Sequence, residues 1–161
     1  MPWNGSDAVA RTPYGTPVLE GLEGPAPCPS CAGTARWQGA QVLLADDSLR
    51  WDTEVVCPRC GGAVAACGRE LPAGPRERML AEHGRTELRL GPSADRVTVM
   101  RVLRRELGIG LGEVRALLER GYGGTFPETE LLARKLRAVG VDARAVRGTG
   151  EFSEGRRSSP P

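Results

Sequence analysis

Long apolar runs are missing from this sequence of 161 residues. None approaches the roughly 20 residues that a membrane-spanning helix requires. Residues 1–25 also lack the basic start and the apolar stretch of a signal peptide. We therefore expect a cytoplasmic protein with no membrane partner.

Aromatic residues, lysine and histidine are scarce as well. Aromatics make up 4% of the chain, which holds 22 glycines and 13 prolines. This composition leaves little material for one large core, and small cores often need a metal. His83 is the only histidine, and the sequence contains neither a nucleophile with its base nor a phosphate-binding loop. We therefore expect no enzymatic activity and no small-molecule substrate.

Four of the five cysteines form two matched pairs, C-P-S-C at 28–31 and C-P-R-C at 57–60. Each pair predicts a tight turn, because proline presets the backbone, and Gly33 and Gly61 are expected to supply positive φ angles. Two such pairs are typical of a tetrahedral zinc site, and four thiolates leave no open position for catalysis. We expect one structural Zn²⁺ bound by Cys28, Cys31, Cys57 and Cys60.

The alternatives for the paired cysteines are thiol–disulfide chemistry and unpaired buried thiols. A redox pair usually occurs once, on a βαβ unit that the sequence around these pairs does not suggest. Cys67 fits best as a small buried hydrophobic residue, with a ligand or a sensor thiol as alternatives. His83 lies beside a predicted helix end, where a cation suits the helix dipole, and a role as ligand or catalyst is the weaker reading.

The chain divides into five segments. Residues 1–25 are predicted to be a flexible arm and residues 148–161 a disordered tail. Residues 26–72 form the predicted zinc ribbon, residues 73–85 a linking helix and residues 86–147 a second compact domain. The predicted fold class is therefore α+β.

Inside the ribbon, residues 36–44 and 49–56 are predicted strands of one hairpin, long enough to absorb the wide spacing between the cysteine pairs. Trp51, Thr53 and Val55 alternate with charged residues, which is the period of a half-exposed strand. In the second domain we expect strands at 86–90 and 142–146 and helices at 96–107, 111–120 and 128–139.

Charge is divided unevenly, with a net charge of −3 over residues 1–74 and +5 over residues 75–147. The helix predicted at 96–107 carries one apolar stripe for packing and a second, mixed stripe of Val97, Met100, Arg101 and Arg104. On periodicity alone, the second stripe is either a docking surface or a wide core face with arginines at its margin.

The run DRVTVMRVLRRELGIGLGEVRALLE at 95–119, together with ARKLRAVGVDARAV at 133–146, resembles the C-terminal domain of the bacterial large-subunit ribosomal stalk protein (the L-seven/L-twelve protein). The likeness covers about residues 86–146. It implies three helices on one face of a three-stranded sheet. It also implies a surface that recruits translational GTPases, at positions corresponding to Arg96, Val97, Met100, Arg101, Arg104, Glu113 and Arg115.

Three departures set this chain apart from that family. Gly112 replaces a lysine of the family, and the loop at 121–130 is short and lacks the family's lysines, which leaves the middle strand in question. The family's dimerisation region and hinge are replaced by the cysteine module. We therefore expect a stalk-like domain reused in another protein.

These observations favour a non-enzymatic zinc-binding adaptor that docks a protein partner, with a translational GTPase or the ribosome as the first candidate. A nucleic-acid-binding ribbon is the second hypothesis, with Trp37 and Trp51 as stacking residues, although such residues are more often hairpin core. An antitoxin or immunity-type inhibitor is the third.

Overall fold

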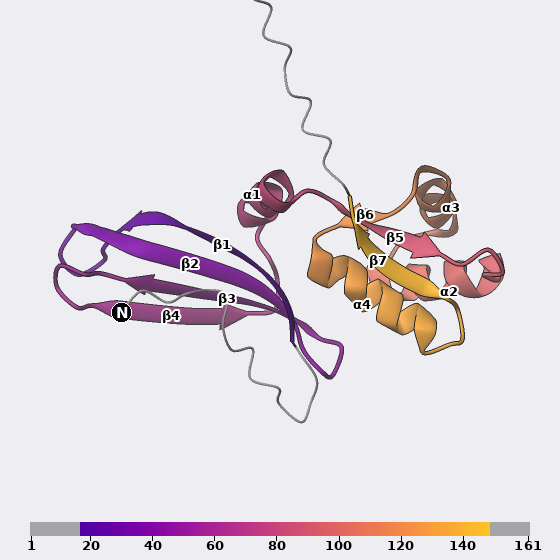
Figure 1. Ribbon diagram of the computed structural model, residues 1–161, viewed down its shortest axis with the longest axis horizontal. Helices are drawn as coiled ribbons and strands as arrows, with labels where there is room; N and C mark the ends of the chain where they lie inside the picture. The colour runs from indigo at the N-terminus through magenta and orange to yellow at the C-terminus, as the bar shows by residue number, and fades with distance from the viewer. Residues whose placement is uncertain (1–16, 149–161) are drawn as a thin grey trace, which may run out of the picture.

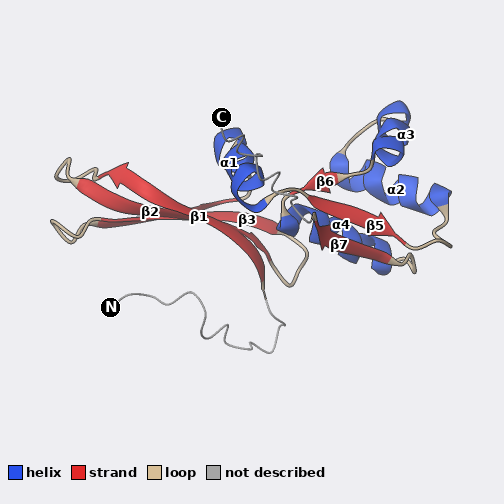
Figure 2. Ribbon diagram, turned by 45° about the horizontal axis from the view of Figure 1, so that its top comes forward, coloured by secondary structure: helices blue, strands red, loops and turns tan. Residues whose placement is uncertain are grey.

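The computed structural model describes residues 17–148, which form an α+β protein with four helices and two antiparallel sheets. The two sheets lie at opposite ends of an elongated molecule, and the helix nearest the middle is α1 (Figures 1 and 2). Within residues 17–148, no helix is both long enough and apolar enough to cross a membrane. The tail expected at residues 148–161 lies outside the described part from residue 149 onward, as do the first 16 residues of the expected arm.

The first sheet is a meander of four strands in the order β1-β2-β3-β4. The strands are β1 (Val18–Pro27), β2 (Thr34–Leu43), β3 (Leu49–Val56) and β4 (Ala63–Gly68). The predicted hairpin is therefore present as β2 and β3. The expected flexible arm is wrong over residues 18–25, because these residues pair along their length with β2.

One face of this sheet holds a small apolar cluster. Leu22, Trp51 and Met79 are buried, and Trp37 packs against them. The two indole rings lie with their centroids 6.2 Å apart. Both rings pack over Gly39, where an added Cβ would lie 2.4 Å from the Trp51 ring. Trp51 is thus part of this core, and Trp37 is partly buried against it.

Helix α1 (Ala73–His83) covers the outer edge of β1. Arg78 donates to the carbonyl oxygen of Glu23, and His83 Nε2 lies 2.6 Å from the carbonyl oxygen of Gly21. An open strand edge invites pairing with other chains, so these contacts protect that side of the sheet. The predicted linking helix is therefore an integral part of the first module.

The second sheet has the order β6-β5-β7. Its strands are β5 (Thr86–Leu90), the two-residue β6 (Gly123–Gly124) and β7 (Ala143–Arg147), and the helices are α2 (Arg96–Leu107), α3 (Leu111–Arg120) and α4 (Phe126–Arg137). Asp95 caps α2 through the Thr98 N–H, and Gly108 ends it with φ 64°. The helices and the sheet enclose one core of Val99, Val102, Leu103, Val114, Leu132, Ala133, Leu136, Val141 and Ala143.

The two halves meet at the N-terminus of α4. The carboxylate of buried Glu20 in β1 accepts from the Phe126 N–H at 3.1 Å and from Arg147 at 2.9 Å. The buried Thr125 hydroxyl donates to the side-chain oxygen of Gln41 in β2. The bonds provide partners for an N–H group at the N-terminus of α4 and for polar atoms that are buried there. They therefore hold the first sheet against α4.

A second set of bonds joins α1 to the same helix end. Arg76 donates from two nitrogens to the two carboxylate oxygens of Glu128, each at 2.8 Å. Glu128 also accepts from the Thr125 N–H, which completes a capping box with the Thr125 hydroxyl. Further out, Lys135 and Arg134 pair with Asp47 in the β2–β3 turn. The joint between the halves is therefore mostly polar.

Candidate metal centre

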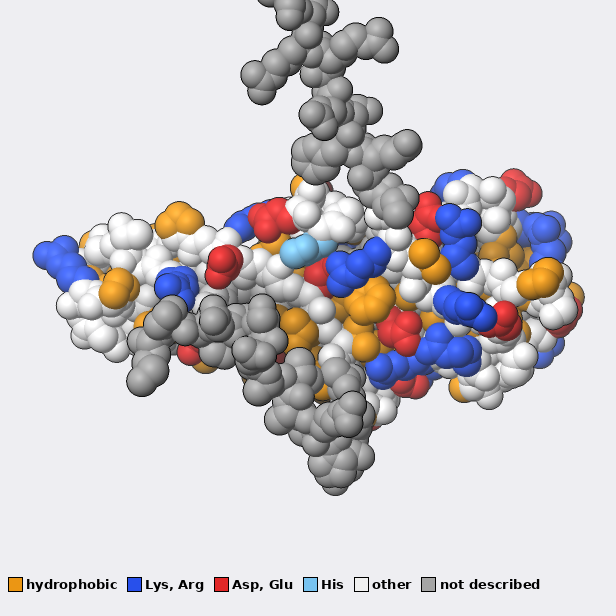
Figure 3. All heavy atoms as spheres, in the orientation of Figure 1, with side chains coloured by type: hydrophobic (Ala, Val, Ile, Leu, Met, Phe, Trp, Pro, Cys, Tyr) orange, Lys and Arg blue, Asp and Glu red, His pale blue; other side chains and the backbone are white. Residues whose placement is uncertain are grey.

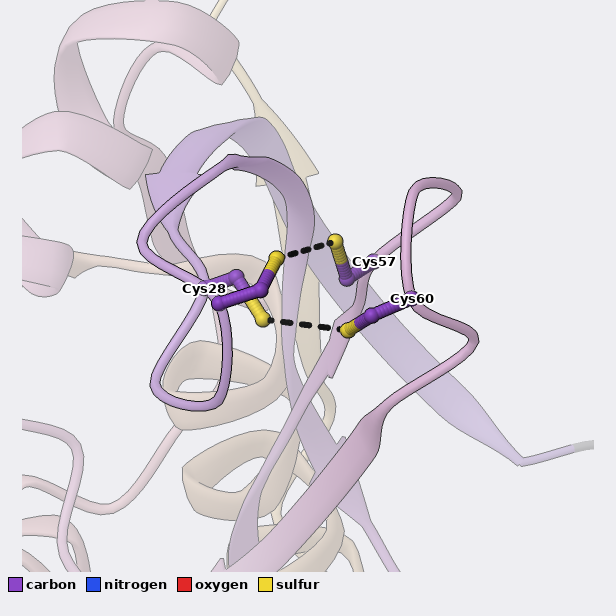
Figure 4. A group of neighbouring side chains, drawn as sticks. Cys28, Cys57 and Cys60 are labelled. Carbon is purple, nitrogen blue, oxygen red and sulfur yellow. Dashed lines mark hydrogen bonds between the residues drawn. The ribbon is translucent and has the colours of Figure 1, made fainter.

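Two loops at the far end of the first sheet bring four sulfur atoms together. Residues 28–33 join β1 to β2, and residues 57–62 join β3 to β4, so both loops emerge at the same end of the meander. The Cys28 and Cys60 Sγ atoms are 3.7 Å apart, as are those of Cys31 and Cys57. All four lie within 4.8 Å of one another (Figure 4). The structure thus unites the four predicted ligands.

The two loops have the same backbone design. The Cys28 N–H donates to the Gly33 carbonyl at 2.7 Å, and the Cys57 N–H donates to the Gly62 carbonyl at 2.9 Å. A second bond closes each turn onto the carbonyl of its first cysteine, from Ala32 at 3.0 Å and from Gly61 at 2.9 Å. Each sulfur pair therefore projects from a closed, rigid loop.

The positive φ angles differ in part from the sequence expectation. Gly61 has φ 71° as predicted, but in the first loop the left-handed residue is Ala32, at φ 55°, and not Gly33. Gly33 and its counterpart Gly62 serve another purpose. An added Cβ would lie 3.3 Å from the Cys31 sulfur or 3.2 Å from the Cys60 sulfur, so glycine leaves room for the metal ligands.

Backbone N–H groups point at the sulfurs. Ser30 donates to Cys28 Sγ and Gly62 donates to Cys60 Sγ, each at 3.4 Å. The bonds from Ser30 and Cys31 lower the pKa of the Cys28 thiol to about 6. At Cys31 the Gly33 N–H lowers the pKa, but the neighbouring sulfurs and burial outweigh it and raise the pKa to about 12. The backbone donors therefore favour the thiolate form of Cys28.

The sulfur geometry fits a tetrahedral metal ion. With metal–sulfur bonds of about 2.3 Å, the edges of a tetrahedron of sulfurs measure about 3.8 Å, close to the 3.7 Å of two of the separations here. Cys28 and Cys57 are buried, Cys31 is partly buried and Cys60 is exposed. The four cysteines are positioned to hold one metal ion with no vacant coordination position.

Cys67 and His83 lie apart from this cluster. Cys67 is exposed on β4, so the expectation of a buried hydrophobic residue is wrong. The run of small residues AVAACG has no alternation of apolar and polar residues, so its place at a sheet edge could not be predicted from the sequence. His83 ends α1 and contacts the β1 backbone, so the structure gives it a structural contact and no partner among the sulfurs.

The residues expected to dock a partner lie on α2 and α3. Val97 is 62% exposed, and Arg96, Arg101 and Arg104 are exposed beside it, whereas Val99, Val102 and Leu103 point into the core. Met100 is half-buried and packs against that core. On α3, Glu113 and Arg115 are exposed, and the Glu113 carboxylate caps the helix by accepting from the Gly110 N–H at 2.7 Å.

Basic side chains gather over the half of the molecule that holds β5 and β7 on the face shown in Figure 3. This distribution agrees with the net charge of residues 75–147. Comparison of the chain with protein-family models, curated proteins and solved structures gives no match.

Proposed function

We propose that this protein is a non-enzymatic adaptor in which a structural zinc ion orders a zinc ribbon and a stalk-like domain docks a protein partner. The observation that carries the zinc assignment is the pair of 3.7 Å sulfur separations across two matched loops. Tetrahedral thiolate sites select zinc or iron, and a site closed by four cysteines has a structural role.

Metal analysis of the purified chain tests the metal assignment. We expect one zinc per chain, and we expect Cys31→Ser to lose it while Cys67→Ser keeps it. Cys67 is the matched control because it is the fifth cysteine and lies outside the cluster. One iron per chain, with the visible absorption of an iron–thiolate centre, would contradict zinc.

The docking assignment rests on the mixed stripe of α2. Val97 and Arg101 are exposed, so the stripe offers apolar and basic contacts on a helix whose opposite side is fixed in the core. The resemblance of residues 86–146 to the ribosomal stalk domain makes a translational GTPase or another ribosome-associated protein the first candidate. Partly buried Met100 would contribute the inner margin of this surface.

A pull-down from host lysate tests the docking face. The bait is the full chain, compared with Met100→Glu/Arg101→Glu, and we expect translation GTPases or ribosomal proteins to be lost with the variant. The control is Val146→Glu/Arg144→Glu, which makes the same charge change at exposed positions of β7. Equal recovery with both variants would place the partner elsewhere, and one unrelated stoichiometric protein would favour an inhibitor.

A further inference from the structure

The first sheet has one protected edge and one open edge. The β1 edge is closed by Arg78 and His83 of α1. At the opposite edge, all six residues of β4 are exposed, and Val64 reaches 52%. The sequence of β4, AVAACG, contains no charged residue and no proline, which are the usual protections of an edge strand.

The free hydrogen-bonding groups of β4 follow from the register of the sheet. In an antiparallel ladder, successive residues direct their N–H and C=O groups alternately to one side and the other. The carbonyls of Gly21 and Glu23 in β1 face α1, away from the sheet. The registers of β1 with β2, β2 with β3 and β3 with β4 extend this alternation across the sheet. The backbone N–H and C=O groups of Ala65 and Cys67 in β4 therefore point away from β3, toward the open edge.

Two carboxylates lie directly behind these positions. Glu54 is opposite Ala65, and Asp52 is opposite Cys67, so each acid shares a row and a face with a small side chain. Glu54 is exposed and has no ion-pair partner within residues 17–148. Asp52 binds Arg50 through Oδ2, but its Oδ1 is buried without a hydrogen-bond partner.

We propose that β4 is a docking edge for an extended segment of a partner protein that carries basic residues at positions i and i+2. Such a segment would add a fifth strand, bonding to the outward groups of Ala65 and Cys67. Its basic side chains would extend over these two small residues toward Glu54 and Asp52, about 10 Å away at the spacing of two strands. Its remaining side chains would cover Val64.

Charge selects this occupant over a second copy of the chain. A copy pairing through its own β4 would bring another uncharged strand, leaving Glu54 without an ion-pair partner and Asp52 with Arg50 alone. The rim around this face adds Glu23 and Glu82, of which Glu82 is paired with Arg78. Together with Asp52 and Glu54 these acids outnumber the nearby arginines Arg50 and Arg78, so the face favours a cationic segment. The assignment uses only the first sheet and does not depend on the docking face of α2.

Fluorescence anisotropy with a labelled peptide, Thr-Val-Arg-Val-Arg-Val-Thr, tests the proposal on the full chain. We expect this peptide to bind at least about tenfold more tightly than the same peptide with glutamate in place of arginine. The variant Ala65→Pro removes one outward N–H and leaves the β3–β4 ladder intact, so it should weaken binding about fivefold to tenfold. Metal content and melting temperature should change little.

Two further variants separate docking from simple misfolding. Ala66→Pro removes an N–H that bonds to β3, so it should lower the melting temperature where Ala65→Pro does not. Asp52→Lys/Glu54→Lys should reverse the preference, so that the glutamate peptide binds better. Failure of the arginine peptide to bind at millimolar concentration, or equal binding by Ala65→Pro, overturns the proposal. A wild-type dimer that Ala65→Pro converts to monomer would assign the edge to a second copy instead.

Discussion

The two halves of the molecule are stabilised in different ways. The second half encloses nine buried side chains between one sheet and the helices α2, α3 and α4. The first sheet and α1 share a buried apolar cluster of three residues, Leu22, Trp51 and Met79, with a separate group around the cysteines. A sheet with so small a core needs another source of stability, and the sulfur cluster lies at the end farthest from the second half.

The comparison indicates that the two halves have different sources of stability. The first half depends on its metal site, the second on apolar burial, and the polar joint at α4 connects them. Changes at the sulfurs, in the α2–α4 core and at the joint should therefore have distinguishable effects.

Metal removal should unfold the first sheet selectively. Structural zinc contributes about 10–16 kcal/mol to the folding of small zinc peptides. Chelation, or Cys57→Ser, should therefore abolish the amide signals of β1–β4 in a heteronuclear NMR spectrum and leave those of α2, α3 and α4 in place. Cys67→Ser is the control, with a spectrum and metal content like those of the native chain. Dispersed signals from β2 and β3 after complete chelation would contradict this dependence.

A cavity in the core of the second half should destabilise that half and leave the metal-bound first sheet folded. Leu103 is fully buried on α2, and Leu103→Ala should cost about 3 kcal/mol of the unfolding free energy of the second half. Urea unfolding followed at α2–α4 amides measures it. The metal should stay bound at urea concentrations below this unfolding transition. Val97→Ala on the exposed side of the same helix should change the unfolding free energy by less than about 0.5 kcal/mol, and a large effect there would place Val97 in the core.

The joint should couple the two halves. Arg76→Ala leaves the Glu128 carboxylate, 16% exposed, without its bidentate partner. We expect a loss of about 2 kcal/mol, and a single thermal transition should separate into two. Glu77→Ala on the same helix, outside the joint, is the control. A single transition in Arg76→Ala with unchanged midpoint would show that the halves are coupled by other contacts.

The ion pair of Arg76 and Glu128 also makes the stability of the protein depend on pH. Burial raises the pKa of Glu128, but the hydrogen bonds and charge of Arg76 outweigh it, so the pKa lies below its usual value. A lowered pKa in the folded state means that this contribution is complete above the ordinary glutamate pKa and is lost as the pH falls through the lower folded value. The difference in stability between the native chain and Arg76→Ala should therefore shrink in acid.

Local signals in the sequence predicted much of this fold. Helices α2 and α3 occur at the predicted residues because Asp95, Gly108 and Gly121 mark their ends. Helix α4 begins two residues earlier than expected, at Phe126. The capping box formed by Thr125 and Glu128 was a readable signal for that start.

Other features depend on contacts that the local sequence does not show. Strand β1 contains Pro25 and Pro27, which argue against a strand, but both stand at positions whose backbone faces away from β2, so no ladder bond is lost. The joint unites Glu20, Gln41 and Thr125 from distant segments. The four metal ligands could be predicted because their spacing is local, whereas the acids behind β4 required the register of three strands.

The smallest predicted effect compares the two cysteine loops. Both place one residue in the left-handed region, Gly61 in one loop and Ala32 in the other. Gly61→Ala adds a side chain to that conformation and should lower stability by about 1 kcal/mol, although no atom lies within 4 Å of the new Cβ. Ala32→Gly relieves the same strain but gives the unfolded chain more freedom, so its net effect should be near zero or slightly stabilising. Thermal unfolding of the metal-bound variants measures both. If the two substitutions destabilise equally, the loops differ by more than this one residue, and their matched backbone bonds do not make them energetically equivalent.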